Sequence, residues 1–341
     1  MIKINMFSSA EKVPGQGVAS AYRELVNLIQ DHLSDKFSVF LNTYRSSDIS
    51  HYHTIDFTFY LSTFLPNRGR TIGYVHFLPE TLVGSLKLPK IIKPIVSWYV
   101  LAFYRRMNAL VVVNPSFIPD LIDAGIPEEK ITYIPNFVNP NNFYELSIKD
   151  KKNIRKTHGY DLKKKIVLGV GQVQVRKGIF DFIKLAQRNP EWIFIWVGGF
   201  SFGRITDGYE ELKKIIKNPP KNLIFPGILP RSELNNYYNI ADVFLLPSYS
   251  ELFPMSALEA FSTHTPTVLR DLELYKFVID GYYASGADID ELESQLKTLL
   301  SNPRIYKQYM QKAIDASIKY SPKNVAKLWE KYYAEQFEKN N

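Results

Sequence analysis

Short β-branched runs alternate with helical patterns along most of the chain, and this alternation occurs in two successive blocks. In the first block, strands are predicted at 2–7, 38–41, 71–76, 109–114 and 131–134, with helices at 19–33, 91–107 and 117–124. After a lysine-rich stretch, strands are predicted at 165–171, 192–198, 223–225, 243–247 and 267–269, with helices at 179–187, 209–216, 231–240 and 256–261. Such alternation predicts parallel sheets covered by helices on both faces, so we expect two doubly wound, Rossmann-like α/β domains.

The expected domains span residues 1–145 and 160–321, and a C-terminal helix at about 322–341 is expected to pack back on the first domain. A chain of 341 residues that is 45% hydrophobic can bury two cores. Disorder is expected only in the lysine-rich connection at 149–156 and in the last few residues. Because ligands of doubly wound sheets bind beyond the carboxyl ends of the strands, functional residues should directly follow strands.

The composition favours a cytoplasmic protein. The absence of cysteine excludes disulfides and thiolate metal sites and fits a reducing compartment. Residues 1–7 suit a buried strand and are too few for a signal peptide, and no run of 18 apolar residues predicts a membrane span. The net charge of +8 suggests anionic partners, but no recognisable module predicts nucleic-acid binding, and no motif predicts an oligomeric state.

The segment from Pro247 to Ala260 carries the strongest chemical signal. A strand ends at Pro247, a loop with Glu251 follows, and a helix begins near Pro254 and contains Glu259. The helix start presents free N–H groups and a positive dipole to an anion such as a diphosphate, and the two carboxylates can accept hydrogen bonds from sugar hydroxyls. On spacing alone, two solvated glutamates around an ordinary helix start explain the segment equally well.

A second segment has the chemistry of an anion site. A strand ends in Gly169-Val-Gly171, and Arg176 and Lys177 follow at the start of the next helix. Glycine lets the backbone approach a ligand closely, and a guanidinium beside an ammonium suits a diphosphate. An Arg-Lys pair is more often part of a solvated face, but the two segments together are much more specific than either one alone.

Both segments resemble the motifs of glycosyltransferase family 4, a retaining family with the GT-B fold. The Glu251-x7-Glu259 pattern and the Arg-Lys-Gly after a glycine-rich strand end resemble that family's donor site. The family usually has Gly-Phe-Gly after the first glutamate, whereas this chain has Leu252-Phe253-Pro254, a stiffer loop that leaves the donor sugar open. The resemblance implies transfer from a nucleoside-diphosphate sugar, UDP-glucose or UDP-galactose, with no metal required.

The resemblance also implies roles for single residues. Arg176, Lys177 and the helix start bind the diphosphate, Glu251 holds the hexose and Glu259 the ribose. A strand-end histidine of the family, which meets the donor sugar, corresponds to His76, although a structural role is the commoner one for such a histidine. The other implied nucleotide-site residues are Gly15, Gln16 and Gly17 in a loop that also suits an ordinary turn, Gly171, the backbone near Ile228, and Phe253, Pro254 and Met255.

The region between Glu80 and Asp120 bears on the acceptor. It has no acidic residue, and its basic residues flank an aromatic helix; these residues are Lys87, Lys90, Lys93, Arg105 and Arg106, with Trp98, Tyr99, Phe103 and Tyr104. Such a helix suits an anionic membrane surface, but a buried helix with solvated lysines explains it equally well.

Two further segments, around Glu251 and near the N-terminus, resemble bacterial synthases that add a hexose to glucosyl-diacylglycerol. That resemblance implies a glycolipid acceptor and a peripheral enzyme on the cytoplasmic face of the membrane. Two alternatives remain at this point. One is a family 4 transferase that acts on a polysaccharide or a protein glycan without membrane affinity, and the other is a non-catalytic sugar-nucleotide binding protein.

Overall fold

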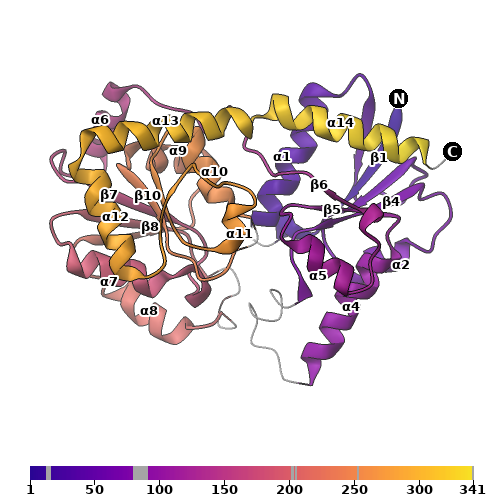
Figure 1. Cartoon of the computed structure of the whole chain (residues 1–341), viewed down its shortest axis with the longest axis horizontal. Coiled ribbons are helices and arrows are strands. Elements are labelled where there is room, and N and C mark those ends of the chain that lie inside the picture. The colour runs from indigo at the N-terminus through magenta and orange to yellow at the C-terminus, as the bar shows by residue number, and fades with distance from the viewer. Residues whose placement is uncertain (13–16, 80–90, 201–202, 204–205, 252, 340–341) are drawn as a thin grey trace. The chain divides into compact units, whose positions relative to one another are not determined.

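The computed structural model describes the whole chain except residues 13–16, 80–90, 201–202, 204–205, 252 and 340–341. The chain forms two compact units, Met1–Phe137 with Pro322–Asn341, and Val138–Ser321 (Figure 1). Each unit contains one six-stranded sheet in which all the paired strands are parallel. The prediction of two doubly wound α/β domains is therefore confirmed.

The sheet of the first unit has the strand order β2-β1-β3-β4-β5-β6. Its strands are β1 (Ile2–Phe7), β2 (Phe37–Leu41), β3 (Ile49–Tyr52), β4 (Arg70–Val75), β5 (Ala109–Val112) and β6 (Ile131–Tyr133). Its helices include α1 (Gly17–His32), α2 (Phe57–Ser62), α4 (Ile92–Arg106) and α5 (Phe117–Asp123). The sequence analysis missed β3, because Ser50 and His51 interrupt its apolar run although all four of its residues are buried.

The C-terminal helix α14 (Pro322–Glu338) completes the core of the first unit. It packs beside α1 (Figure 1) and buries Trp329, Tyr332 and Tyr333. The Tyr333 hydroxyl lies 2.8 Å from Nδ1 of His51 in β3, so a polar contact ties this helix to the sheet.

The sheet of the second unit has the order β12-β11-β10-β7-β8-β9. Its strands are β7 (Ile166–Val170), β8 (Ile193–Val197), β9 (Leu223–Gly227), β10 (Val243–Leu246), β11 (Thr267–Arg270) and β12 (Ala284–Gly286), of which only the three-residue β12 was not predicted. The helices are α6 (Ile148–Thr157), α7 (Ile179–Arg188), α8 (Tyr209–Lys217), α9 (Arg231–Ile240), α10 (Met255–Ser262), α11 (Glu273–Lys276), α12 (Ile289–Ser301) and α13 (Pro303–Lys319).

The expected disorder at 149–156 is wrong, because these residues form most of α6. The Ser147 hydroxyl caps the helix by accepting a hydrogen bond from the Asp150 amide at 3.1 Å. Arg155 then fixes the helix to the second unit by donating to the Ile240 carbonyl and to Oδ2 of Asp242, the latter at 2.8 Å. The lysines form the solvated face of a capped, anchored helix, and their high density alone suggested disorder.

Candidate active site

Two strand ends of the second unit carry the predicted cations and carboxylates. β7 and β10 are parallel neighbours, so their carboxyl ends lie at the same edge of the sheet. Gly171 follows β7, and the short 3-10 helix η3 (Val175–Lys177) brings Arg176 and Lys177 to this edge. The loop after β10 brings Glu251 to the same place, 74 residues further along the chain.

The structure joins Glu251 to both cations. Oε1 of Glu251 lies 2.5 Å from Nζ of Lys177 and also accepts a hydrogen bond from the Ser248 hydroxyl at 2.6 Å. Nη1 of Arg176 lies 3.8 Å from Oε2 of Glu251 and donates to the Ser250 carbonyl at 2.6 Å. Glu251 is only 6% exposed, so it is a buried, ion-paired carboxylate and not a solvated glutamate.

The electrostatics of this cluster favour an anionic ligand. Burial by itself raises the pKa of the Glu251 carboxyl, but the charges of Lys177 and Arg176 outweigh it, and the pKa lies below its ordinary value. Burial lowers the pKa of the Lys177 ammonium, and Glu251 opposes that shift. With Glu251 ionised, two cations face one carboxylate, and the net positive charge can attract a diphosphate.

Two glycines allow the close packing that brings the cluster together. Gly178, directly after Lys177, has φ +71°, and a Cβ there would lie 2.0 Å from the Pro247 carbonyl oxygen. Gly198, after β8, has φ +142°, and a Cβ there would lie 1.8 Å from the Gly171 carbonyl oxygen. At Gly171 itself an added Cβ would make only ordinary contacts, with the side chains of Lys177 and Trp196.

Glu259, inside α10, has a different set of partners. The Tyr238 hydroxyl donates to its Oε2 atom at 2.7 Å, and Nη2 of Arg231 lies 4.0 Å from its Oε1 atom. The Arg231 guanidinium lies over the Phe143 ring, whose centroid is 5.2 Å away. The sequence analysis missed Tyr238 and Arg231, although their spacing of two helical turns, which puts them on one face of α9, was a signal that could have found them.

The other predicted donor-site residues lie close to these clusters in the chain. α10 begins at Met255 with Pro254 at its N-cap, as the motif predicted, and Phe253, Pro254 and Met255 are buried. Ile228 is half exposed, and its side chain lies against Gly199, where an added Cβ would be 3.0 Å from Cγ1 of Ile228. Leu252 lies outside the described residues.

The first unit holds the remaining predicted residues. His76 directly follows β4, and its ring lies 4.2 Å from that of Tyr74 and 5.8 Å from that of His53. Burial lowers the pKa of His76 to about 3, so its imidazole is neutral at pH 7. His76 therefore belongs to a buried row with His51 and His53, which the sequence analysis did not single out. Gly17 opens α1, and Gly15 and Gln16 lie outside the described residues.

Within the part of the chain that the structure describes, no three or more histidine, cysteine, aspartate or glutamate side chains are grouped so that they could hold a metal ion.

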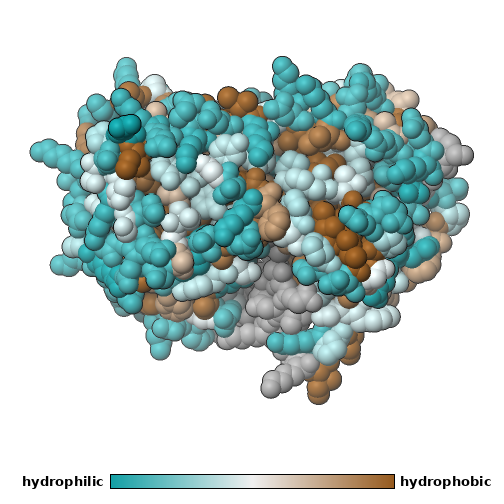
Figure 2. Space-filling model, in the orientation of Figure 1, coloured by the Kyte–Doolittle hydropathy of each residue, from teal (hydrophilic) through white to brown (hydrophobic). Residues whose placement is uncertain are grey.

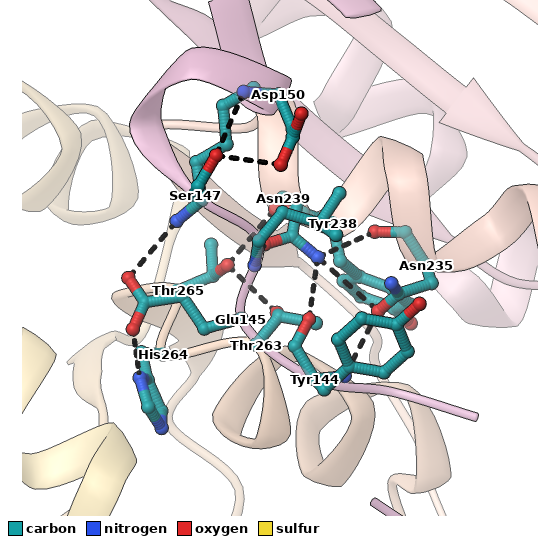
Figure 3. A network of polar contacts seen from close by, with 12 residues as sticks. Tyr144, Glu145, Ser147, Asp150, Asn235, Tyr238, Asn239, Thr263, His264 and Thr265 are labelled. Atoms are coloured by element: carbon teal, nitrogen blue, oxygen red, sulfur yellow. Dashed lines mark hydrogen bonds and ion pairs between the residues drawn. The ribbon is translucent and has the colours of Figure 1, made fainter. Parts of the chain in front are cut away.

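The segment of the second unit that precedes α6 is bound to α9 and to the turn after α10 by a polar network (Figure 3). Asn239 accepts a hydrogen bond from the Leu146 amide at 2.7 Å and donates to the Tyr144 carbonyl at 2.8 Å. His264, which follows the C-cap of α10, lies 2.8 Å from Glu145, so the turn after α10 also contacts this segment. The helix that carries Tyr238 is thus fixed by this segment of its own unit.

Comparisons with known proteins agree with this architecture. The family model described as Glycosyl transferases group 1 matches residues 150–316, and the model described as Glycosyltransferase Family 4 matches residues 20–142. The chain is 52% identical to the alpha-galactosylglucosyldiacylglycerol synthase of Streptococcus pneumoniae over 336 residues, which cover 98% of this chain and 90% of that protein.

Two solved structures resemble the fold at 15% sequence identity. Sucrose-phosphate synthase from Thermosynechococcus elongatus has a TM-score of 0.79 and is matched over 99% of this chain and all of that chain. Anabaena Alr3699/HepE in complex with UDP and glucose has a TM-score of 0.78, with 98% of this chain and all of that chain covered. These likenesses confirm the predicted GT-B architecture. The chain is therefore a glycosyltransferase with the GT-B fold and belongs to glycosyltransferase family 4.

Proposed function

We propose that this enzyme transfers a hexose from UDP-galactose or UDP-glucose to a membrane glycolipid of the glucosyl-diacylglycerol type. The observation that carries the proposal is the 52% identity to a synthase named for galactosylglucosyldiacylglycerol. Because that match covers 98% of the chain, it includes both the donor residues of the second unit and the residues of the first unit.

The donor diphosphate binds at Arg176 and Lys177, next to the start of α10. Negative charge grows on the diphosphate as it leaves, and cations already fixed in a water-poor site stabilise that charge without having to reorganise. Glu251 orients these two cations and accepts hydrogen bonds from the hexose hydroxyls, and Glu259 accepts them from the ribose. On this proposal the two cations do the work that a metal ion would otherwise do.

Transfer proceeds with retention at the anomeric carbon. The bond between that carbon and the phosphate oxygen breaks as the acceptor hydroxyl attacks from the same face of the sugar. The leaving phosphate oxygen accepts the proton of the acceptor hydroxyl, so the atoms balance without a side-chain nucleophile. The neutral imidazole of His76 orients the hexose by a hydrogen bond.

The first unit has an exposed apolar face that supports a lipid acceptor. The α2–α4 face consists of the exposed side chains at the two helices: Phe57, Leu61, Phe64, Leu65, Ile91, Ile92, Ile95 and Trp98. The rings of Tyr60 and Tyr99, 5.7 Å apart, join the two helices. Figure 2 shows hydrophobic side chains at the end of α4 where the helix begins. Exposed apolar patches of this kind mark interaction sites.

The expected aromatic helix is divided between this face and the core. Trp98 is 66% exposed, whereas Phe103 and Tyr104 are buried and pack in the first unit. Arg106 covers the α2–α4 face at one end, with its guanidinium 4.5 Å from the centre of the Phe64 ring. An apolar surface with basic residues beside it suits an anionic membrane that the protein touches from one side. None of the described helices is long and apolar enough to cross a membrane.

A panel of donors and acceptors tests the proposal. The enzyme is incubated with UDP-galactose, UDP-glucose, UDP-N-acetylglucosamine and GDP-mannose, each with glucosyl-diacylglycerol in anionic vesicles, with a polysaccharide or with no acceptor. We expect a diglycosyl lipid and an equal amount of free UDP, only when the lipid is present and only with a UDP-hexose. Sugar transfer to the polysaccharide, or UDP release at the same rate with and without the lipid, would refute the proposal.

A further inference from the structure

We infer that Tyr238 is a positioning residue for Glu259: its hydroxyl fixes the carboxylate that binds the donor ribose and thereby sets the preference for ribose over deoxyribose. The inference rests on the proposed function, which assigns the ribose to Glu259. It adds a residue from α9 that does not itself touch the donor.

The contact between the two side chains has a definite direction. The Tyr238 hydroxyl lies 2.7 Å from Oε2 of Glu259, and both residues are buried. A carboxylate only accepts hydrogen bonds, so the phenol donates its single proton to it, and a bond to a charged acceptor in a buried place is among the strong ones. Burial and the neighbouring Glu259 charge raise the pKa of Tyr238, so the hydroxyl keeps that proton at neutral pH.

The ring of Tyr238 is held on several sides, so its hydroxyl cannot follow a carboxylate that rotates. Phe143 packs against it edge to face with ring centres 5.7 Å apart, and the ring of Phe244 lies 5.6 Å away on β10. The backbone carbonyl of Tyr238 accepts a hydrogen bond from the Thr265 hydroxyl at 3.0 Å. Asn239, next to it in α9, accepts a hydrogen bond from the amide of Leu146, in the segment before α6 (Figure 3).

This rigidity matters for a group that must meet ribose hydroxyls. Each carboxylate oxygen can accept more than one hydrogen bond, so Glu259 can keep Tyr238 and still accept from a sugar hydroxyl. With Oε2 fixed by Tyr238 and Nη2 of Arg231 4.0 Å from Oε1, the plane of the carboxylate is set before the nucleotide arrives. A preorganised carboxylate increases the affinity of the enzyme for a nucleotide that has the ribose hydroxyl, and it does not increase the affinity for one that lacks this hydroxyl.

The test compares Tyr238→Phe with Tyr237→Phe, which removes the same hydroxyl from the adjacent buried tyrosine of α9. Tyr237 faces away from Glu259, with its ring 5.4 Å from that of His158.

Calorimetry measures the binding of UDP, 2′-deoxy-UDP and 3′-deoxy-UDP to the full chain. For Tyr238→Phe we expect UDP affinity to fall about tenfold, the usual effect of one hydrogen bond to a charged group. The affinity for the deoxy analogue that lacks the hydroxyl bound by Glu259 should barely change, so the preference for ribose collapses, while Tyr237→Phe keeps it.

Steady-state kinetics and a second variant sharpen the result. The KM for the UDP-hexose should rise in Tyr238→Phe with little change in kcat, and Glu259→Gln should also lose the ribose preference. If Tyr238 acts through Glu259, the double variant loses no more ribose preference than Glu259→Gln alone. An unchanged preference in Tyr238→Phe, equal losses for UDP and both deoxy analogues, or additive losses in the double variant would overturn the inference. Absence of UDP binding by the unaltered enzyme would instead overturn the proposed donor.

Discussion

Nζ of Lys177 lies 2.5 Å from Oε1 of Glu251, and both side chains are largely withdrawn from water. The pair links the end of β7 to the end of β10, so it serves the fold as well as the donor site. Removal of Lys177 leaves the buried Glu251 carboxylate with Arg176, 3.8 Å away, as its remaining cation, and this costs more than the loss of an exposed ion pair.

Lys177→Ala should therefore affect both transfer and stability. We expect a rate of sugar transfer more than tenfold lower, because the diphosphate loses a cation. We expect an unfolding free energy lower by about 2 kcal/mol, because Glu251 loses one charged hydrogen bond and keeps Arg176 and Ser248. Lys297→Ala is the matched control, since Lys297 pairs with Glu293 at 2.7 Å in an exposed place and should change stability by about 0.5 kcal/mol or less. Steady-state transfer and urea unfolding measure the two effects. A Lys177→Ala rate near that of the unaltered enzyme would contradict the site assignment.

The buried histidine row should make the protein sensitive to mild acid. Burial lowers the pKa values of His51 and His76 to about 3, and that of His53 well below its ordinary value. The unfolded chain then binds more protons than the folded one between about pH 6.5 and pH 3, so stability falls as the pH falls through that window. For His51 and His76 the loss is about 2 kcal/mol each at pH 5.

Urea unfolding at pH 7, 6 and 5.5 checks this dependence above the range in which carboxylates titrate. His53→Gln should flatten the slope, whereas His32→Gln, at an exposed position of α1, should leave it unchanged. A slope that is the same in all three proteins would show that the buried histidines do not cause it.

The lysine-rich helix α6 should depend on Arg155 and not on its lysines. Arg155 and Asp242 are both mostly buried, and Asp242 also accepts a hydrogen bond from the Ile166 amide at 2.8 Å. Arg155→Ala should lower the unfolding free energy by about 2 kcal/mol, because Asp242 loses its hydrogen-bonded cation and keeps only Lys165, 3.5 Å from Oδ1. Lys152→Ala, at an exposed position of the same helix, should cost about 0.5 kcal/mol or less. UDP affinity should be unchanged in both, and a fall in Arg155→Ala alone would place α6 in the donor site.

The α2–α4 face should control binding to vesicles. Ile95→Ser should lower partition into vesicles of phosphatidylglycerol about tenfold, since one large apolar side chain no longer enters the interface. Ile318→Ser is the control, because Ile318 in α13 of the second unit is 60% exposed and Ile95 is 61% exposed. Vesicle sedimentation measures binding, and UDP affinity should stay the same in both. Equal losses in the two variants would argue against a specific membrane face.

The sequence by itself determined most of the strands and the charged residues that follow them. Apolar periodicity is a local property, so β1 and β7 to β11 could be predicted, and so could the positions of Arg176, Lys177, Glu251 and Glu259 after strand ends. β3 could not be predicted, because its burial comes from neighbouring strands and helices and is not visible in its polar residues.

The tertiary structure alone decided how these residues pair. Strand order puts β7 beside β10, and only that neighbourhood joins Lys177 to Glu251. The contacts of Tyr238 with Glu259 and of Arg155 with Asp242 depend in the same way on packing between elements far apart in the chain. Spacing along a chain fixes the face on which a side chain lies, but its partner is set by which elements the hydrophobic core brings together.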